Sequence, residues 1–197
     1  MIIHFICRGN AFRSIIAEAY LNSLEIKNWI VLSSGTAAAA EKSRNLASYE
    51  RTLELLKKHG IRGFAKVGYG DQLTQSRLGR ANITVCLNRR VYDECLRYVT
   101  FPASPRIWSV ADLGEPGRIS DVESERRLYR EEAYQEIVRN VEQLISDLNT
   151  SLIALAAGRA RRNAPVTRLR MAAWASGWSA VSGRRVTSSA GRSRSRR

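Results

Sequence analysis

The sequence predicts an α/β protein in which helices flank a single, doubly wound sheet of four parallel strands. The chain opens on an apolar run, MIIHFI, without polar alternation, and such a strand is typically buried on both faces of its sheet. Similar short runs then alternate with segments whose apolar residues recur at helical spacing, the pattern of parallel strands joined by helices. With 44% hydrophobic residues among 197, the chain can bury a sizeable core.

The first unit is a strand, a loop and a helix. Residues 1–6 form the predicted strand. Residues 14–24 form the predicted helix, because their apolar side chains share one helical face, and Ser14 is a suitable first residue for it. The connecting loop therefore lies at the carboxyl end of a buried strand.

The later elements follow from the same signals, with Gly35 and Gly60 as stop signals. Strands are expected over 28–34, 81–87 and 106–110, and helices over 48–59, 72–80, 91–98 and 124–148. The last helix has the clearest stripe, because Ile137, Val141, Leu144, Ile145 and Leu148 fall on one face. A turn-rich segment, ADLGEPGRIS, separates it from the last strand.

Charge divides the chain at about residue 150. Residues 1–150 hold 21 Lys and Arg against 18 Asp and Glu, whereas residues 151–197 hold 11 Arg and no acid. We therefore expect a nearly neutral globular domain over 1–150 and a basic, largely disordered tail over 151–197. Such a tail can bind polyanions nonspecifically, although a shifted reading frame in GC-rich DNA would produce the same composition.

Several protein classes are excluded by composition. No apolar run approaches the roughly 20 residues that span a bilayer, and the N-terminus lacks the basic segment of a secretory signal. Cys7, Cys86 and Cys95 make an odd and small set, which argues against a disulfide framework and for reduced thiols. We expect a cytoplasmic protein without membrane contact.

The loop after the first strand, CRGNAFRS, carries the chemistry. Cys7 is followed by five residues and then by Arg13 and Ser14, and Gly9 and Asn10 can take the left-handed conformations that a tight anion-binding loop needs. A thiol beside a helix N-terminus and a guanidinium is held as a nucleophilic thiolate. Arg13 can grip two oxygens of a bound phosphoryl group.

The position in the fold makes this pattern specific, because an Arg six residues after a Cys also arises by chance in an Arg-rich chain. The other two cysteines lack it: Tyr92 follows Cys86 and Phe101 follows Cys95 at that spacing. The alternative for Cys7 is a small buried hydrophobe at a strand end. A strand, a Gly-Asn loop, an Arg-Ser pair and a helix in succession favour the nucleophile.

These residues resemble a known family. The segment ICRGNAFRSIIAEAYL closely resembles the phosphate-binding loop of the low-molecular-weight protein tyrosine phosphatases, and residues 32–36, LSSGT, are similar to a segment that follows the second strand there. The resemblance covers about residues 1–148. It implies a phosphatase I-like four-stranded sheet, no metal and no other cofactor, and hydrolysis of phosphotyrosine through a phosphocysteine intermediate.

The resemblance also implies the roles of the loop residues. Cys7 would be the nucleophile and Arg13 the phosphate clamp, while Asn10 and Ser14 would shape the loop and support the thiolate. The phosphate would be bound by Arg8, Gly9, Asn10, Ala11, Phe12, Arg13 and Ser14. Expected partners are a phosphotyrosine-containing protein or a small aryl phosphate, and inorganic phosphate or another oxyanion.

A general acid must protonate the leaving oxygen, and the family places an Asp-Pro between the last strand and the last helix. Asp112 stands at that place, followed by Leu113 instead of Pro. We expect Asp112 to be the general acid. Glu115 and Asp121 are the alternatives, and Asp112 would otherwise be a solvated loop carboxylate without a role in the reaction.

Two loop positions depart from the family. Phe12 stands where many members have a second, protective cysteine, and we expect it to line the substrate mouth. Arg8 is expected to add positive charge at the rim, unless it is only a solvated loop residue.

Two other functions remain open. Thioredoxin-dependent arsenate reductases share this fold and loop, and Cys7, Cys86 and Cys95 would be their three relay thiols. The relay needs thiols that can reach disulfide geometry, whereas Cys86 and Cys95 also suit a buried strand and a helix face. The second alternative is a catalytically weak, anion-binding relative.

Overall fold

The computed structural model describes residues 1–113 and 122–163. The chain divides into two units, Met1–Ala157 and Gly158–Arg197, and the sheet with its helices belongs to the first. The boundary expected at residue 150 between a globular domain and a tail stays a prediction. Residues 164–197, which hold most of the expected disordered tail, lie outside the described residues.

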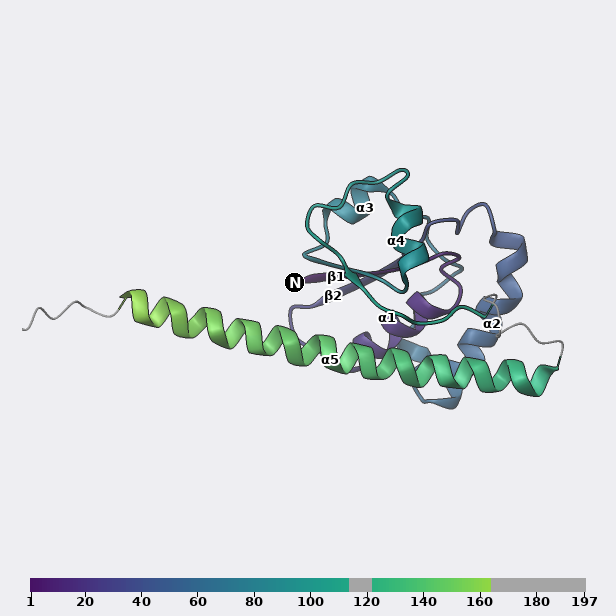
Figure 1. The fold of residues 1–197 in the computed structure, drawn as a ribbon. Coiled ribbons are helices and arrows are strands. Elements are labelled where there is room, and N and C mark those ends of the chain that lie inside the picture. Colours follow the sequence, from purple (N-terminus) through teal and green to yellow (C-terminus); the bar gives the residue numbers. More distant parts are fainter. Residues whose placement is uncertain (114–121, 164–197) are drawn as a thin grey trace, which may run out of the picture. The chain divides into compact units, whose positions relative to one another are not determined.

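A parallel sheet forms the centre of the first unit (Figure 1). Its strands run in the spatial order β2-β1-β3-β4, and every neighbouring pair is parallel. The predicted fold class is therefore confirmed. The strands are β1 (Ile2–Cys7), β2 (Ile30–Gly35), β3 (Ile83–Cys86) and β4 (Arg106–Ile107).

The helices occupy most of the predicted segments, with different ends. They are α1 (Arg13–Ser23), α2 (Lys42–Lys58), α3 (Gln75–Gly79), α4 (Arg89–Cys95) and α5 (Glu123–Asn163), with a 3-10 helix η1 (Arg62–Phe64) that the sequence did not predict. Side-chain caps begin two of them: Thr74 accepts from the Arg77 N–H, and Asn88 accepts from the Val91 N–H. Helix α2 starts before residue 48, in turns that contain Lys, Arg, Leu and Ala as good helix formers. These turns carry no apolar stripe, so the sequence did not reveal them.

Both faces of the sheet are covered. Ile3, Phe5 and Cys7 point to one side, where they pack in a core with α1 and α5, whereas Ile6 points to a second core with α3 and α4. Figure 1 shows α3 and α4 above the sheet and α1 and α5 below it. Burial on both faces explains why β1 carries an apolar run without alternation.

Helix α5 corrects one expectation. It was predicted to end near residue 148, and residues 151–163 were expected in a disordered tail, but the helix continues to Asn163. The added turns are rich in Ala, Leu and Arg, residues of high intrinsic helix propensity. Within the described residues, no helix is long and apolar enough to cross a membrane.

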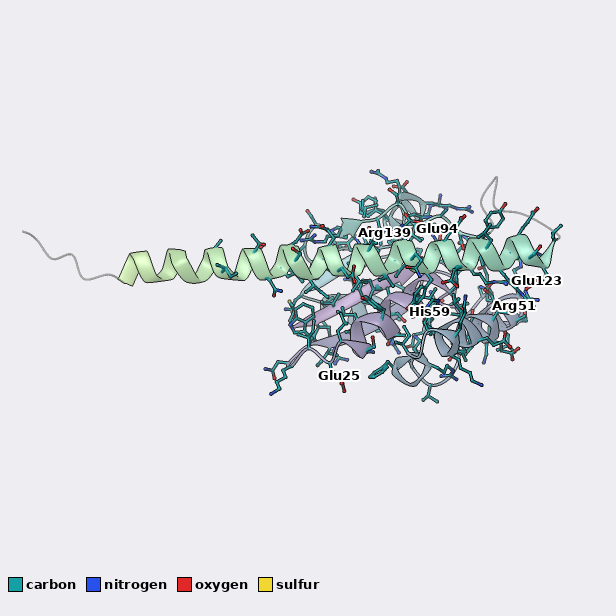
Figure 2. The ribbon with its side chains drawn as sticks, turned by 90° about the horizontal axis from the view of Figure 1, so that it is seen from below. Glu25, Arg51, His59, Glu94, Glu123 and Arg139 are labelled. Atoms are coloured by element: carbon teal, nitrogen blue, oxygen red, sulfur yellow. The ribbon has the colours of Figure 1, made fainter. Side chains whose placement is uncertain are left out.

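The first half of α5 packs as its stripe predicts. Ile137, Val141 and Leu144 are buried in the core beside α1. At the end of α2, the His59 ring stacks on Tyr134 of α5 with 3.7 Å between ring centroids. Figure 2 looks onto α5 and shows His59 beside it. These contacts fix α5 against α1 and against the end of α2.

Candidate functional site

The loop of residues 7–14 lies at the carboxyl edge of the sheet, between β1 and α1. Asn10 has the positive φ of 46° that the sequence predicted at this turn. Gly35, at the end of β2, packs directly on the loop: a Cβ there would lie 2.5 Å from the Arg8 carbonyl oxygen and 2.7 Å from the Asn10 nitrogen. The residue at position 35 must therefore be glycine, which the sequence reasoning missed as a site requirement.

Cys7 is buried, with its sulfur turned into the loop. The Ser14 hydroxyl oxygen lies 3.0 Å from Sγ, and the Asn10 backbone N–H donates to Sγ over 3.2 Å. The sulfur also lies beside the first turn of α1, where backbone N–H groups have no helical partner. Donors that converge on a sulfur favour its anionic form.

Asn10 is the centre of the hydrogen-bond network beneath the loop, and it is fully buried. Its Nδ2 donates to the Ser14 and Ser33 hydroxyl oxygens over 2.8 and 2.9 Å. Its Oδ1 accepts from the Lys66 Nζ over 2.5 Å and from the Asp71 backbone N–H over 2.6 Å. Four hydrogen bonds saturate this amide and hold the loop in its left-handed turn.

Arg13 and Asp112 lie together although 99 positions separate them in the chain. The Arg13 side chain is only 2% exposed. Its guanidinium donates to the Val110 carbonyl oxygen over 3.0 Å and, through its second terminal nitrogen, to the Asp112 carboxylate. Cys7, Arg13 and Asp112 all line one cavity of about 70 Å³, which has room for a small tetrahedral anion.

The sequence model of the low molecular weight phosphotyrosine protein phosphatase family matches residues 2–156. The chain belongs to this family. Membership identifies it as a phosphatase, and the resemblance inferred from the loop is confirmed. A comparison with curated proteins finds no match.

Solved structures share the fold of this phosphatase at low sequence identity. Wzb of Vibrio vulnificus, in complex with benzylphosphonate, is 19% identical with a TM-score of 0.59, over 74% of this chain and 97% of that one. YfkJ of Bacillus subtilis is 18% identical with a TM-score of 0.55, over 77% and 96%. The tyrosine phosphatase Wzb of Escherichia coli K30, in complex with sulphate, is 18% identical with a TM-score of 0.52, over 75% and 97%.

Arg8 does not present an unpaired positive charge at the rim of the phosphatase site. Its guanidinium donates to Glu41 over 2.8 and 3.0 Å and also to Glu94 of α4, so two carboxylates balance the charge. Burial favours protonation of Glu41, but the Arg8 guanidinium outweighs it and lowers the pKa of Glu41. Thr36 also joins this group of side chains, because its hydroxyl donates to Glu94 over 2.7 Å.

Phe12 lines the cavity as expected, but it is only 5% exposed and belongs to the core. Three polar residues from outside the loop, Glu41, Asn45 and Ser48, also line the cavity. The loop is also tied to α2, because the Ala11 carbonyl oxygen accepts from the Thr52 hydroxyl over 2.8 Å. Glu115 and Asp121, the alternative acids, lie outside the described residues.

The segment from Ala65 to Gln72 supports the loop from below, and sequence reasoning missed it. Tyr69 donates from its hydroxyl to the Gly9 carbonyl oxygen over 2.9 Å. A Cβ at Gly70 would lie 2.4 Å from the Asn10 carbonyl oxygen, so a larger residue would displace the loop. Only the closely spaced glycines of this segment signalled a tight approach.

Cys86 and Cys95 do not join this site. Both side chains are fully buried. They lie in the core with α3 and α4, on the opposite side of the sheet from Cys7. A hydrogen bond with Cys95 and burial raise the pKa of the Cys86 thiol above its ordinary range. The two thiols are neighbours in an apolar core, as the structural interpretation of their positions predicted.

Proposed function

We propose that this chain is a protein tyrosine phosphatase that hydrolyses phosphomonoesters through a phosphocysteine intermediate on Cys7, without a metal. The observation that carries the proposal is the shared cavity: Cys7, Arg13 and Asp112 line one small space, and the Arg13 guanidinium donates to the Asp112 carboxylate. A nucleophile, a phosphate clamp and an acid are the groups that this chemistry needs.

In the first step the Cys7 thiolate attacks phosphorus in line with the ester oxygen. An S–P bond forms, the P–O bond to the leaving group breaks, and its electron pair stays on the oxygen. Asp112 gives its proton to that oxygen. The loop N–H groups and Arg13 bind the equatorial oxygens, whose negative charge is spread in the transition state.

Arg13 must exchange partners when substrate binds. The guanidinium donates to the Asp112 carboxylate, and the same N–H group is needed to bind a phosphoryl oxygen. Phosphoryl oxygens that take over the guanidinium release Asp112 to face the leaving oxygen. The hydrogen bond to the Val110 carbonyl oxygen holds the Arg13 guanidinium in the same orientation while its other partner changes.

In the second step water attacks the phosphocysteine. Asp112, now ionised, takes the proton of the water, a P–O bond forms, and the S–P bond breaks with its electron pair returning to Cys7. Inorganic phosphate leaves. One carboxylate thus serves as acid and then as base.

The proposed substrates are a phosphotyrosine-containing protein or a small aryl phosphate, in the cytoplasm. Benzylphosphonate and sulphate, the ligands of the two Wzb structures, are tetrahedral anions of the kind that such a loop would hold. An aryl leaving group fits a site whose acid is a single carboxylate, because its oxygen needs less assistance than an alkyl oxygen.

Arsenate reduction remains the other enzymatic candidate, and the structure offers it little support. The relay would need Cys86 or Cys95 to reach Cys7, yet their side chains belong to cores on opposite faces of the sheet. No relay can form without a large rearrangement of β3 and α4.

The test is hydrolysis of p-nitrophenyl phosphate by the reduced full-length chain, with and without a chelator, beside arsenate-dependent NADPH oxidation with thioredoxin and its reductase. We expect hydrolysis that Cys7→Ser abolishes and that Cys86→Ser and Cys95→Ser retain. Arsenate turnover that requires all three cysteines would replace the proposal with the reductase. Silence in both assays, with phosphate still bound, would indicate the weak anion-binding relative.

The physiological substrate class is tested with peptides. We expect phosphotyrosine peptides to be hydrolysed faster than phosphoserine or phosphoarginine peptides of the same sequence. Asp112→Asn should slow the hydrolysis of poor leaving groups most, by about 10²-fold, and that of activated aryl esters least. An equal loss for all leaving groups would show that Asp112 is not the acid.

A further inference from the structure

Lys66 is a nearly buried lysine directly beneath the loop, and nothing in the proposed reaction uses it. Its side chain is 15% exposed, and it follows η1 in the supporting segment. The ammonium donates to the Asn10 Oδ1 over 2.5 Å, to the Ser33 carbonyl oxygen over 3.3 Å and to the Asp71 carboxylate over 3.2 Å. Burying a lysine head group is costly, so three acceptors around it indicate a fixed position.

Lys66 and the Asp71 backbone N–H together decide which way the Asn10 amide faces. An ammonium and the Asp71 backbone N–H are both donors, and only the oxygen end of the amide can accept from them. The nitrogen end must therefore face Ser14 and Ser33 and donate to both hydroxyl oxygens. With the amide reversed, two donors would meet the Asn10 NH₂ group, and the hydrogen bonds from Lys66 and from the Asp71 backbone N–H would be lost.

The orientation of Asn10 in turn sets the direction of the bond between Ser14 and Cys7. The Ser14 oxygen accepts from Asn10, so its own hydrogen is available for the Cys7 sulfur, 3.0 Å away. The positive charge on Lys66 polarises the amide and strengthens each donor along this chain. A hydroxyl that donates to sulfur stabilises the thiolate and not the thiol.

We propose that Lys66 is a positioning residue for the nucleophile: its ammonium acts through Asn10 and Ser14 to hold Cys7 as the thiolate. The effect is indirect, since Lys66 touches neither the sulfur nor the cavity. This inference rests on the proposed function in one respect: the Cys7 thiolate is the nucleophile of the proposed reaction.

Other charged groups lie around the hydrogen-bonded chain Lys66–Asn10–Ser14–Cys7, which we call the Lys66 relay. Asp71 pairs with Lys66 and, over 2.9 Å, with Arg77; burial alone would raise its pKa, but these two cations lower it. Glu18 of α1 accepts from Ser33 over 2.5 Å, and burial raises its pKa despite the nearby Lys66. His4 is buried close to Lys66 and Arg77, and burial is the main reason that its pKa falls to about 4.

The charges that face the sulfur itself are different ones. They are Arg13 and Asp112, which line the same cavity, and Arg8 with its partner Glu41 at the rim. Tyr69 is a further titratable neighbour, and burial first and then the nearby Cys7 raise its pKa. None of these contacts Lys66 through a hydrogen bond within the described part of the chain. A change at Lys66 therefore reaches Cys7 through Asn10 and Ser14.

The experiment measures the rate of Cys7 alkylation by iodoacetamide as a function of pH, in the full-length chain, by mass spectrometry of the Cys7 peptide. In Lys66→Met the midpoint of the profile should move up by about one pH unit, which is about tenfold in thiolate population at low pH. Lys66→Arg, which keeps the charge and the donors, should restore most of the shift. Lys58→Met removes a solvent-exposed lysine paired with Glu131 and should leave the midpoint unchanged.

A merely structural role for Lys66 would give a different result. A loosened loop would change the alkylation rate at every pH without moving the midpoint. Lys66→Arg and Lys66→Met would then give the same midpoint, although only Lys66→Arg keeps the charge. That outcome overturns the proposal. Where Lys66→Met fails to fold by circular dichroism, Lys66→Gln, which keeps a neutral donor, carries the test and must show the same upward movement.

The relay is tested by a double-variant cycle with Ser14→Ala. The shift caused by Lys66→Met should largely disappear in the Ser14→Ala background, because the relay is already broken there. Additive shifts would show that Lys66 acts through space and would overturn the relay.

The readout does not depend on turnover. A wild-type chain that hydrolyses no phosphomonoester but shows the Lys66 shift would contradict the proposed function and leave the inference in place. A chain that hydrolyses phosphomonoesters and shows no shift would contradict the inference alone.

Discussion

The two faces of the sheet hold the same functional group in opposite environments. Cys7, on the face shared with α1 and α5, meets the Ser14 hydroxyl and the Asn10 N–H and shares a cavity with Arg13. Cys86, on the face shared with α3 and α4, has another buried thiol as its polar neighbour. Donors and charge around a sulfur, and not the thiol itself, therefore determine which cysteine can act as a nucleophile.

The sharpest test of this difference is selective alkylation. At neutral pH iodoacetamide should label Cys7 at least about a thousandfold faster than Cys86 or Cys95, because labelling of the core pair requires a local opening that costs about 4 kcal/mol. Phosphate should protect Cys7. Peptide mass spectrometry over time measures all three rates, and comparable labelling of Cys86 would contradict the comparison.

Arg13→Lys breaks the active face without touching the other. Lysine keeps the positive charge but cannot donate at once to the Val110 carbonyl oxygen and to two phosphoryl oxygens. We expect kcat for p-nitrophenyl phosphate to fall about 10²- to 10³-fold. Steady-state kinetics measure this loss, and thermal unfolding of the same variant serves as the control for folding. A loss below about threefold would mean that the fork geometry of Arg13 is not used.

Acid should weaken the other face through His4. Its ring is fully buried and lies 2.7 Å from the Ser34 hydroxyl, and burial is the main reason that its pKa is about 4 in the folded chain, against 6.5 ordinarily. The unfolded chain therefore binds more protons between these values, so His4 favours folding above pH 6.5, and this advantage falls as the pH drops toward 4.

The loss attributable to His4 between pH 7 and pH 4 is about 3 kcal/mol. Urea unfolding at both pH values measures it, with His4→Gln as the comparison. The wild type should lose more of its free energy of unfolding than the variant does. Equal losses in the two chains would show that His4 takes up its proton as readily when folded.

The smallest expected effect comes from Cys86→Ala. The substitution removes a sulfur from the core without adding a polar group, and we expect the free energy of unfolding to fall by about 1 to 2 kcal/mol. Turnover of p-nitrophenyl phosphate should stay within twofold of the wild type. Urea unfolding and kinetics on the same preparation separate the two quantities, and a large loss of kcat with intact folding would place Cys86 in the reaction.

Much of the fold could be predicted because its signals are local. The β1 run, the stripe of α5 and the turn at Asn10 each depend on residues that are neighbours in the chain. The ends of α2 and α5 could not be predicted, since their added turns rest on helix propensity without an apolar face. The two carboxylates that pair with Arg8 could not be predicted, because Glu41 and Glu94 lie 33 and 86 positions away in the chain.

The fold class and the grouping of Cys7, Asn10, Arg13 and Ser14 follow from local sequence, because one loop and one helix turn bring these residues together. The pairing of Arg13 with Asp112 and the position of Lys66 under Asn10 depend instead on how distant segments pack. The tertiary structure also decided the separation of Cys86 from Cys7 by the sheet. These contacts join segments far apart in the chain, and strand order and packing set them, so no spacing along the sequence could specify them.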